Sequence, residues 1–163
     1  MKDKVLEFQK IYLEEIDKYR DVKGPDNDIA WEKIHMASCG HIGYLLGRKR
    51  GVDPQLAAIA CSVHDYGRVI TGLQKGHAEA GYLPVKDFLK KTGMFSTRQI
   101  EEIALSVKNH SRKGEIGSPL EEIVKDADIL DCSMYGYEFP RQEQRDRLER
   151  LLKDMEADDG RQL

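Results

Sequence analysis

The chain has 163 residues, of which 40% are hydrophobic and 34% are charged, and its formal net charge is -3. This length predicts one domain that is large enough to bury a core of its own. The nearly balanced charge creates no strong field for nucleic acid or an anionic membrane surface, so we expect neither as a partner. No apolar run approaches the roughly 20 residues of a membrane helix, and acidic residues near the N-terminus argue against a signal peptide, so we expect a cytoplasmic protein.

Apolar residues recur every three or four positions along almost the whole chain, which predicts helices and no strands. The first expected helix covers residues 2–22. Its apolar face carries Val5, Phe8, Tyr12, Ile16 and Tyr19. A Gly-Pro pair ends it, and a second helix runs from about residue 29 to residue 49. Asp53 caps a third helix, which has Pro54 at its first position and contains the stretch "SVHDYGR".

Four further helices are expected in the second half of the chain. They cover approximately residues 77–91, 98–110, 120–131 and 140–158. In the last of these, four apolar residues fall at helical spacing among many charges, which favours a surface helix docked on the domain. A homodimer that forms through this helix is the alternative. The sequence therefore predicts a single-domain, all-α bundle of about six to seven helices over residues 1–163.

One acidic residue stands at the end of the most apolar helix. Asp65 follows the run from Leu56 to Cys61 and is preceded directly by His64. A carboxylate at the end of a core helix is costly unless something neutralises it. A metal ion would do so, although adjacent helical side chains diverge by about 100°, so ligands from other helices must complete the shell. Nitrogen and carboxylate oxygen ligands together suit iron, manganese, cobalt, nickel or zinc.

The other candidate ligands lie on separate expected helices. Of the five histidines, His35 lies in the middle of a helix, His77 opens one and His110 closes one. Asp128 lies within "DADILD", on a helix whose other side is apolar. His41 follows His35 by six residues and faces another side of the helix, so we expect it at the surface or in a structural role.

Several neighbours of these candidates are expected to play supporting or structural parts. Asp131 lies one helical turn beyond the candidate aspartate and is expected to support the site, whereas Asp126 should point elsewhere. Cys39 and Cys61 lie in apolar helical stretches and are expected to behave as small buried hydrophobes. Cys132 lies close to the candidate aspartate, and an inert thiol is the favoured interpretation.

The order and local setting of these residues resemble the signature of the HD superfamily of metal-dependent phosphohydrolases. That signature runs His, then His-Asp, then Asp, and it is matched here by His35, His64-Asp65 and Asp128. The run "GVDPQLAAIACSVHDYGR" is similar to the family's segment around the His-Asp pair. "GHAEAG", "VKNHS" and "SPLEEIVKDADILD" are similar to its later segments. The resemblance covers roughly residues 30–135 and implies an all-α fold of the HD type.

The resemblance also implies a site for one or two divalent transition-metal ions, with iron or manganese favoured. The first ion would be held by His35, His64, Asp65 and Asp128. The second would be held by His77 and His110, with Asp65 bridging the two ions. Two such ions would clamp a phosphoryl oxygen and lower the pKa of a bridging water.

The catalytic residues that the resemblance implies are Asp65, Arg68 and Asp128. Asp128 would orient the attacking water, and Arg68 would bind phosphate and stabilise charge in the transition state. The expected activity is therefore hydrolysis of a phosphate ester or anhydride by a metal-activated water. The expected partner is a small phosphorylated substrate, with a nucleotide favoured.

Two other functions share this set of ligands. One is an HD-fold oxygenase that activates oxygen at a di-iron centre, and the other is a nucleotide or metal sensor without turnover. Three basic residues flank His110, namely Lys108, Arg112 and Lys113, and each is expected to be a solvated surface charge.

Overall fold

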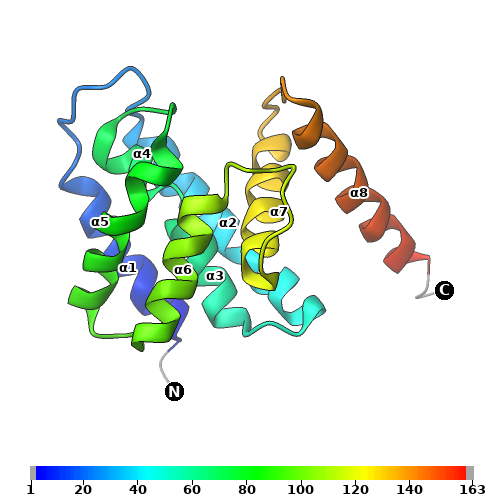
Figure 1. Cartoon of the computed structure of the whole chain (residues 1–163), viewed down its shortest axis with the longest axis horizontal. Coiled ribbons are helices and arrows are strands. Elements are labelled where there is room, and N and C mark those ends of the chain that lie inside the picture. The colour runs from blue at the N-terminus through cyan, green and yellow to red at the C-terminus, as the bar shows by residue number, and fades with distance from the viewer. Residues whose placement is uncertain (1–2, 161–163) are drawn as a thin grey trace.

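The structure is a computed structural model that describes residues 3–160 (Figure 1). Over that range it contains no strand and eight helices, which are α1 (Lys4–Asp17), α2 (Ile29–Arg50), α3 (Pro54–Val63), α4 (Tyr66–Thr71), α5 (His77–Thr92), α6 (Thr97–Asn109), α7 (Pro119–Met134) and α8 (Gln142–Asp159). The prediction of an all-α bundle is confirmed. Residues 1, 2 and 161–163, which belong to the predicted domain, lie outside the described residues.

The third expected helix is interrupted, and this interruption raises the number of helices above the six to seven predicted. α3 ends at Val63 and α4 begins at Tyr66, so His64 and Asp65 form the junction between them. The backbone of Asp65 has φ -90° and ψ 16°, which departs from helical values and turns the chain.

The first helix is shorter than the predicted span of residues 2–22, because α1 ends at Asp17. The carbonyl groups of Arg20 and Val22 accept hydrogen bonds from the side-chain amide of Asn27, at 3.1 and 2.7 Å. These carbonyls are therefore satisfied without a helix, and the chain turns toward α2.

An aromatic cluster joins α1, α4 and α5. Phe8 and Tyr12 on the apolar face of α1 are buried, and their rings lie 6.1 and 5.8 Å from the ring of Phe88 in α5. Tyr66, which directly follows the His-Asp pair, stacks on Phe88 at 5.4 Å. The cluster therefore anchors the start of α4 and, with it, the position of Asp65.

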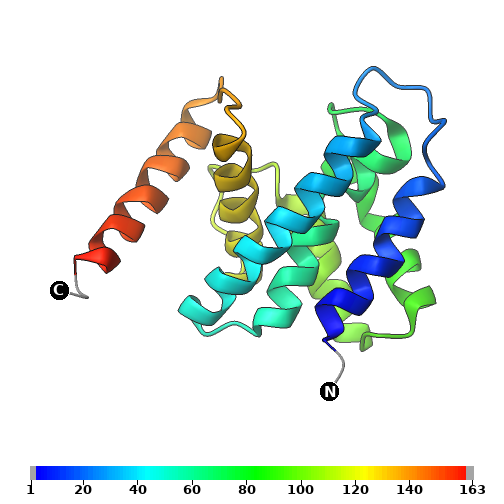
Figure 2. The ribbon, with the colours of Figure 1, turned by 180° about the vertical axis from the view of Figure 1, so that it is seen from behind.

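Close packing of α2 against α3 and α7 brings His35, His64 and Asp128 together. Figure 2 shows α2 crossing the bundle next to α1, and α2 packs on both α3 and α7. The approach to α3 requires Gly43, because a Cβ at this position would lie 2.5 Å from Sγ of Cys61.

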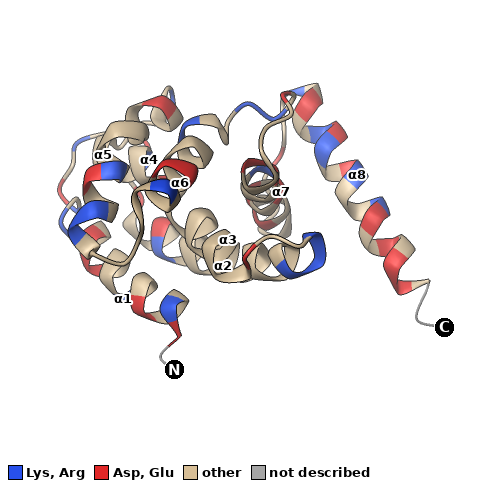
Figure 3. Cartoon of the chain, turned by 60° about the horizontal axis from the view of Figure 1, so that its bottom comes forward, with Lys and Arg blue, Asp and Glu red and all other residues tan. Residues whose placement is uncertain are grey.

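The last helix packs on α7 and leans away from the rest of the bundle (Figure 1). Its buried residues are Arg147 and Leu151, and both acidic and basic residues occur along it (Figure 3). It is therefore a helix docked on the surface of the domain. Among residues 3–160, no helix is long and apolar enough to cross a membrane.

Candidate metal centre

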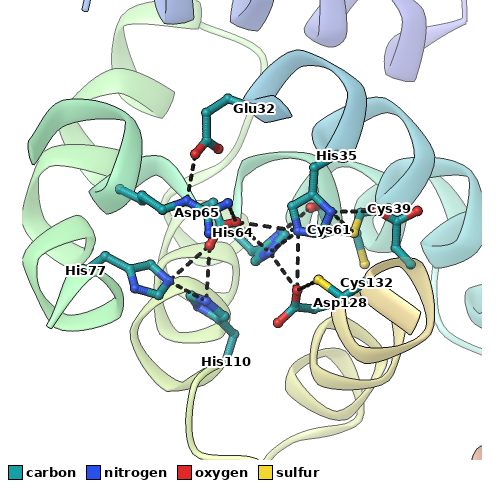
Figure 4. Close-up of polar contacts among 12 residues, drawn as sticks. Glu32, His35, Cys39, Cys61, His64, Asp65, His77, His110, Asp128 and Cys132 are labelled. Carbon is teal, nitrogen blue, oxygen red and sulfur yellow. Dashed lines mark hydrogen bonds and ion pairs between the residues drawn. The ribbon is translucent and has the colours of Figure 1, made fainter. Parts of the chain in front are cut away.

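The junction between α3 and α4 directs two consecutive side chains toward one centre. A continuous helix would separate them by about 100°, and the bend at Asp65 changes this relation. Figure 4 shows the side chains that meet around the junction, which include His35, His64, Asp65, His77, His110 and Asp128. They come from α2, from the junction itself, from the start of α5, from the residue after α6 and from α7.

Each of the four imidazole rings in this centre is oriented by a hydrogen bond at Nδ1. The partners are Asp131 Oδ2 for His35 (2.6 Å), Cys61 O for His64 (2.7 Å), Gln74 O for His77 (2.6 Å) and Val107 O for His110 (2.7 Å). A carbonyl or carboxylate oxygen accepts, so Nδ1 carries the proton and Nε2 of a neutral ring presents a lone pair.

The first group of ligand atoms consists of His35, His64, Asp128 and one oxygen of Asp65. Nε2 of His35 lies 3.2 Å from Nε2 of His64 and 3.2 Å from Oδ1 of Asp128. Oδ2 of Asp65 lies 3.4 Å from Nε2 of His35 and 3.3 Å from Nε2 of His64. These atoms therefore converge on one point between α2, α7 and the junction.

The second group consists of His77, His110 and the other oxygen of Asp65. Nε2 of His77 lies 2.9 Å from Nε2 of His110. Oδ1 of Asp65 lies 3.0 Å from Nε2 of His77 and 3.4 Å from Nε2 of His110. Asp65 therefore shares its carboxylate between the two groups.

The chemistry of these atoms fits metal ions. In each group two imidazole Nε2 atoms face each other beside carboxylate oxygen, an arrangement that a cation between them would stabilise. Converging nitrogen and oxygen donors are the ligands of divalent transition metals. A hydrogen bond from the opposite ring nitrogen to carbonyl or carboxylate is the usual support of a metal-binding histidine. The residues present thus fit the metal site that the sequence predicts.

A comparison with known protein families identifies the domain that carries this centre. The HD domain family matches residues 33–133, which is more than half of the chain. The chain belongs to the HD domain family. HD domains are largely metal-dependent hydrolases and bind divalent metals. No curated protein and no solved structure matches the chain.

The pKa values of two histidines in the HD centre are shifted in opposite directions. Burial lowers the pKa of His64, but the carboxylates of Asp65 and Asp128 outweigh burial and raise this pKa to about 10. Burial lowers the pKa of His110 to about 4, in spite of its contact with Asp65. His110 is therefore neutral at pH 7, with Nε2 available to a metal ion.

The two carboxylates of the centre are held in their charged form by basic neighbours. Burial by itself would raise the pKa of Asp65, but the Arg68 guanidinium holds this pKa well below its usual range. The Lys113 ammonium group likewise outweighs burial at Asp128 and keeps the pKa of that carboxyl well below its usual range. Both oxygens of each group are thus available as anionic ligands.

Gly67, in α4 just after the His64-Asp65 pair, allows His77 to reach the centre. A Cβ at Gly67 would lie 1.8 Å from the backbone oxygen of His77. Only glycine therefore permits α4 to pack this closely on the first turn of α5, where His77 contacts Asp65.

Arg68 lies beside the centre but is already held by protein groups. Its Nη2 lies 2.5 Å from Oδ2 of Asp65, its Nε donates to Glu32 at 2.6 Å and its Nη1 donates to Gln74 at 2.8 Å. Glu32 is buried and was not among the predicted site residues. Its position in the first turn of α2 gave no sign that it would meet a residue of α4.

Lys113 is the clearest correction to the sequence analysis. It is only 2% exposed, whereas a solvated charge was expected, and its Nζ lies 2.5 Å from Oδ2 of Asp128. Arg147 of α8 fixes this loop, because its Nε donates to the carbonyl oxygen of Lys113 at 2.9 Å. The contact joins segments that are 34 residues apart, so no local pattern could have signalled it. Lys108 contacts the ring of Tyr82 instead.

Other predicted neighbours lie where their expected roles require. Asp131 accepts the hydrogen bond from Nδ1 of His35, and Asp126 faces away from the centre, toward Arg147. His41 is exposed on α2. Sγ of Cys132 lies 3.5 Å from Oδ1 of Asp128, and burial raises the pKa of this thiol, so it stays protonated.

The centre opens into a pocket of about 790 Å³. The pocket lies where the loops before α2, before α5, after α6 and after α7 meet, and its lining includes Asp65, Arg68, His77, His110, Lys113 and Asp128. This volume falls within the range of small-molecule sites, roughly 300–1,000 Å³. A small ligand can therefore reach the carboxylates of Asp65 and Asp128, and the rings of His77 and His110, from one side.

Proposed function

We propose that this HD domain protein is a metal-dependent phosphohydrolase that cleaves a phosphate ester or anhydride of a nucleotide or another small phosphorylated metabolite. The main support is the arrangement of Asp65, whose two oxygens face two converging groups of ligand atoms at the floor of a pocket. Two such groups within reach of one substrate are suited to clamping a phosphoryl group.

Two divalent ions, with iron or manganese favoured, would occupy the centre. The first would be held by His35, His64, Asp65 and Asp128, and the second by Asp65, His77 and His110. Bound there, they would supply Lewis-acid charge and lower the pKa of a water molecule so that it can act as a nucleophile.

Two basic side chains have donors left for the substrate. An arginine has five N–H donors, and Arg68 uses one on each of three protein groups. A lysine has three donors, and Lys113 uses one on Asp128. Both residues line the pocket, so their remaining donors would bind phosphoryl oxygens and stabilise negative charge as it develops.

Asp128 would position the attacking water. Its carboxylate is charged and lines the pocket beside Lys113. The water oxygen forms the new bond to phosphorus, the bond from phosphorus to the leaving oxygen breaks, and a proton from the water passes to that leaving oxygen or to solvent.

The decisive experiment is a phosphate-release assay. The protein is loaded with Mn²⁺, or with Fe²⁺ without oxygen, and nucleotides, dinucleoside polyphosphates and sugar phosphates are screened as substrates. We expect release that is lost in Asp65→Ala and kept in His41→Ala, a control on an exposed histidine outside the centre.

A different result would redirect the assignment. If the fully metallated protein releases no phosphate from any of these compounds, the hydrolase proposal is wrong. Oxygen uptake by the iron form would then favour the oxygenase, which uses the same ligands, and its absence would favour a sensor.

A further inference from the structure

Three aromatic residues line the pocket that contains the metal centre. Trp31, Tyr137 and Phe139, here called the aromatic wall, line the same pocket as Asp65 and Asp128. None of the three belongs to the segment matched by the HD domain family, which covers residues 33–133. The wall is therefore supplied by the parts of the chain that flank the HD domain.

The wall begins directly at a residue of the metal centre. The ring of Trp31 stacks on that of His35 with 4.8 Å between centroids and an interplanar angle of 16°. The ring of Tyr137 lies 4.9 Å from that of Trp31. A substrate whose phosphate reached the centre would thus place the adjoining part of the molecule against aromatic rings.

The segment that carries Tyr137 and Phe139 is held in place by its own hydrogen bonds. The backbone N–H of Tyr137 donates to Cys132 O at 3.1 Å. Nη1 of Arg145 donates to the carbonyl oxygen of Phe139 at 2.6 Å and to that of Pro140 at 2.8 Å. Little ordering is therefore needed before a ligand binds, which favours affinity.

Tyr137 nevertheless leaves much of its ring uncovered. It is 52% exposed, although it lines a pocket whose floor is polar and charged. Aromatic faces of this kind bind planar rings, and the stacking of a nucleobase on an aromatic side chain depends little on which base is present. A sugar phosphate without a ring of this type would gain nothing from the wall.

We infer that the aromatic wall stacks the base of a nucleotide while the phosphate lies at the metal centre. This inference rests on the proposed function, since it assigns the non-phosphate half of the substrate of that site. It makes Tyr137 and Phe139 specificity-determining residues and predicts that a nucleoside phosphate is preferred to the same phosphate without its base.

The first test measures binding without any phosphate chemistry. Trp31 is the single tryptophan of the chain, so its fluorescence reports ligands at the wall. Adenosine and ribose are titrated into the Mn²⁺-loaded protein, and neither can be hydrolysed by a phosphohydrolase. We expect adenosine to alter the fluorescence saturably and ribose not to do so.

The variants Tyr137→Leu and Phe139→Leu, singly and combined, test which rings are responsible. The combined variant should bind adenosine about fivefold more weakly or worse, as expected for losing a base–aromatic stack. Tyr135→Leu is the matched control, because Tyr135 is also 52% exposed and also contacts Trp31, but does not line the pocket. Unchanged adenosine binding in the combined variant, or no preference for adenosine over ribose in the unmodified protein, overturns the inference.

A kinetic test separates this inference from the proposed function. Adenosine monophosphate and ribose 5-phosphate are compared as substrates, and Tyr137→Leu should raise KM for the nucleotide without changing kcat/KM for ribose 5-phosphate. Adenosine binding that depends on Tyr137, with no phosphate release from any compound, would refute the hydrolase and retain the wall. Phosphate release with equal efficiency from both substrates would retain the hydrolase and refute the wall.

Discussion

Replacing Arg147 with methionine tests whether α8 holds the loop that places Lys113 in the metal centre. Arg147 is 4% exposed, and besides the carbonyl of Lys113 its guanidinium contacts Glu122 and Asp126, each at 2.8 Å. Methionine fills similar volume but removes all of these hydrogen bonds.

The size of the effect follows from what each partner retains. Removing one member of a buried ion pair costs about 3–5 kcal/mol when the other charge is left alone. Here Asp126 keeps its contact with Arg50 at 2.7 Å, and Glu122 keeps Lys125 at 3.2 Å. We therefore expect a loss near the lower end, about 3 kcal/mol, which for a chain of this size lowers Tm by roughly 6–12 °C.

Urea unfolding and thermal melting, followed by circular dichroism, measure this loss. Arg150→Met is the control, because Arg150 is an exposed arginine of the same helix whose one hydrogen bond to residues 3–160 is long, 3.4 Å to Asp146 O. Phosphate release by Arg147→Met should also fall while its metal content is unchanged. A stability loss below about 1 kcal/mol, or a loss equal to that of the control, would refute the structural role given to Arg147.

Four further predictions follow from the site and its supports. Partial burial opposes the charge of Glu122, but hydrogen bonds from Arg147 and from the Gly117 N–H outweigh it and lower its pKa. The stability that Glu122 contributes should therefore be present above its ordinary pKa and be lost as the pH falls through the lower pKa of the folded state. Denaturant midpoints at a series of acidic pH values measure this loss. Arg147→Met should make the denaturant midpoint depend less on pH in this range. Asp65→Ala should lose both metal ions, as measured by elemental analysis after dialysis, and retention of either ion at full occupancy would contradict the bridging role. His110→Ala should retain one ion of the two, so full occupancy of both would contradict the two-metal arrangement. Gly67→Ala should destabilise the fold by about 1–3 kcal/mol or more, because its Cβ would collide with backbone, and an unchanged melting temperature would show that α4 and α5 can separate freely.

Local patterns were sufficient to predict the fold class and most of the helices. Apolar spacing placed Phe8 and Tyr12 on the buried face of α1, and the Asp53-Pro54 pair marked the start of α3. The break at His64-Asp65 was not predicted, because a helix interruption inside an apolar segment depends on the contacts that its side chains make with other helices.

The members of the metal centre could be nominated from the sequence because each lies in a short, recognisable setting. The order His35, His64-Asp65, Asp128 and the settings of His77 and His110 resemble the HD pattern, and the structure brings all six side chains together. Lys113 was misplaced as a surface charge, since a lysine in a polar loop looks the same in sequence whether it is solvated or folded against a buried aspartate.

The helical class, the HD family pattern and the candidate ligands were all predictable from local patterns, because apolar periodicity and motif order act over one helix or one turn. The structure was needed to show that Glu32 and Lys113 support the centre and that Tyr137 lines the pocket. These features depend on contacts between segments far apart in the chain, such as the contact between Glu32 and Arg68, which are 36 residues apart. Packing of whole helices sets such contacts, and no local pattern of residues encodes their geometry.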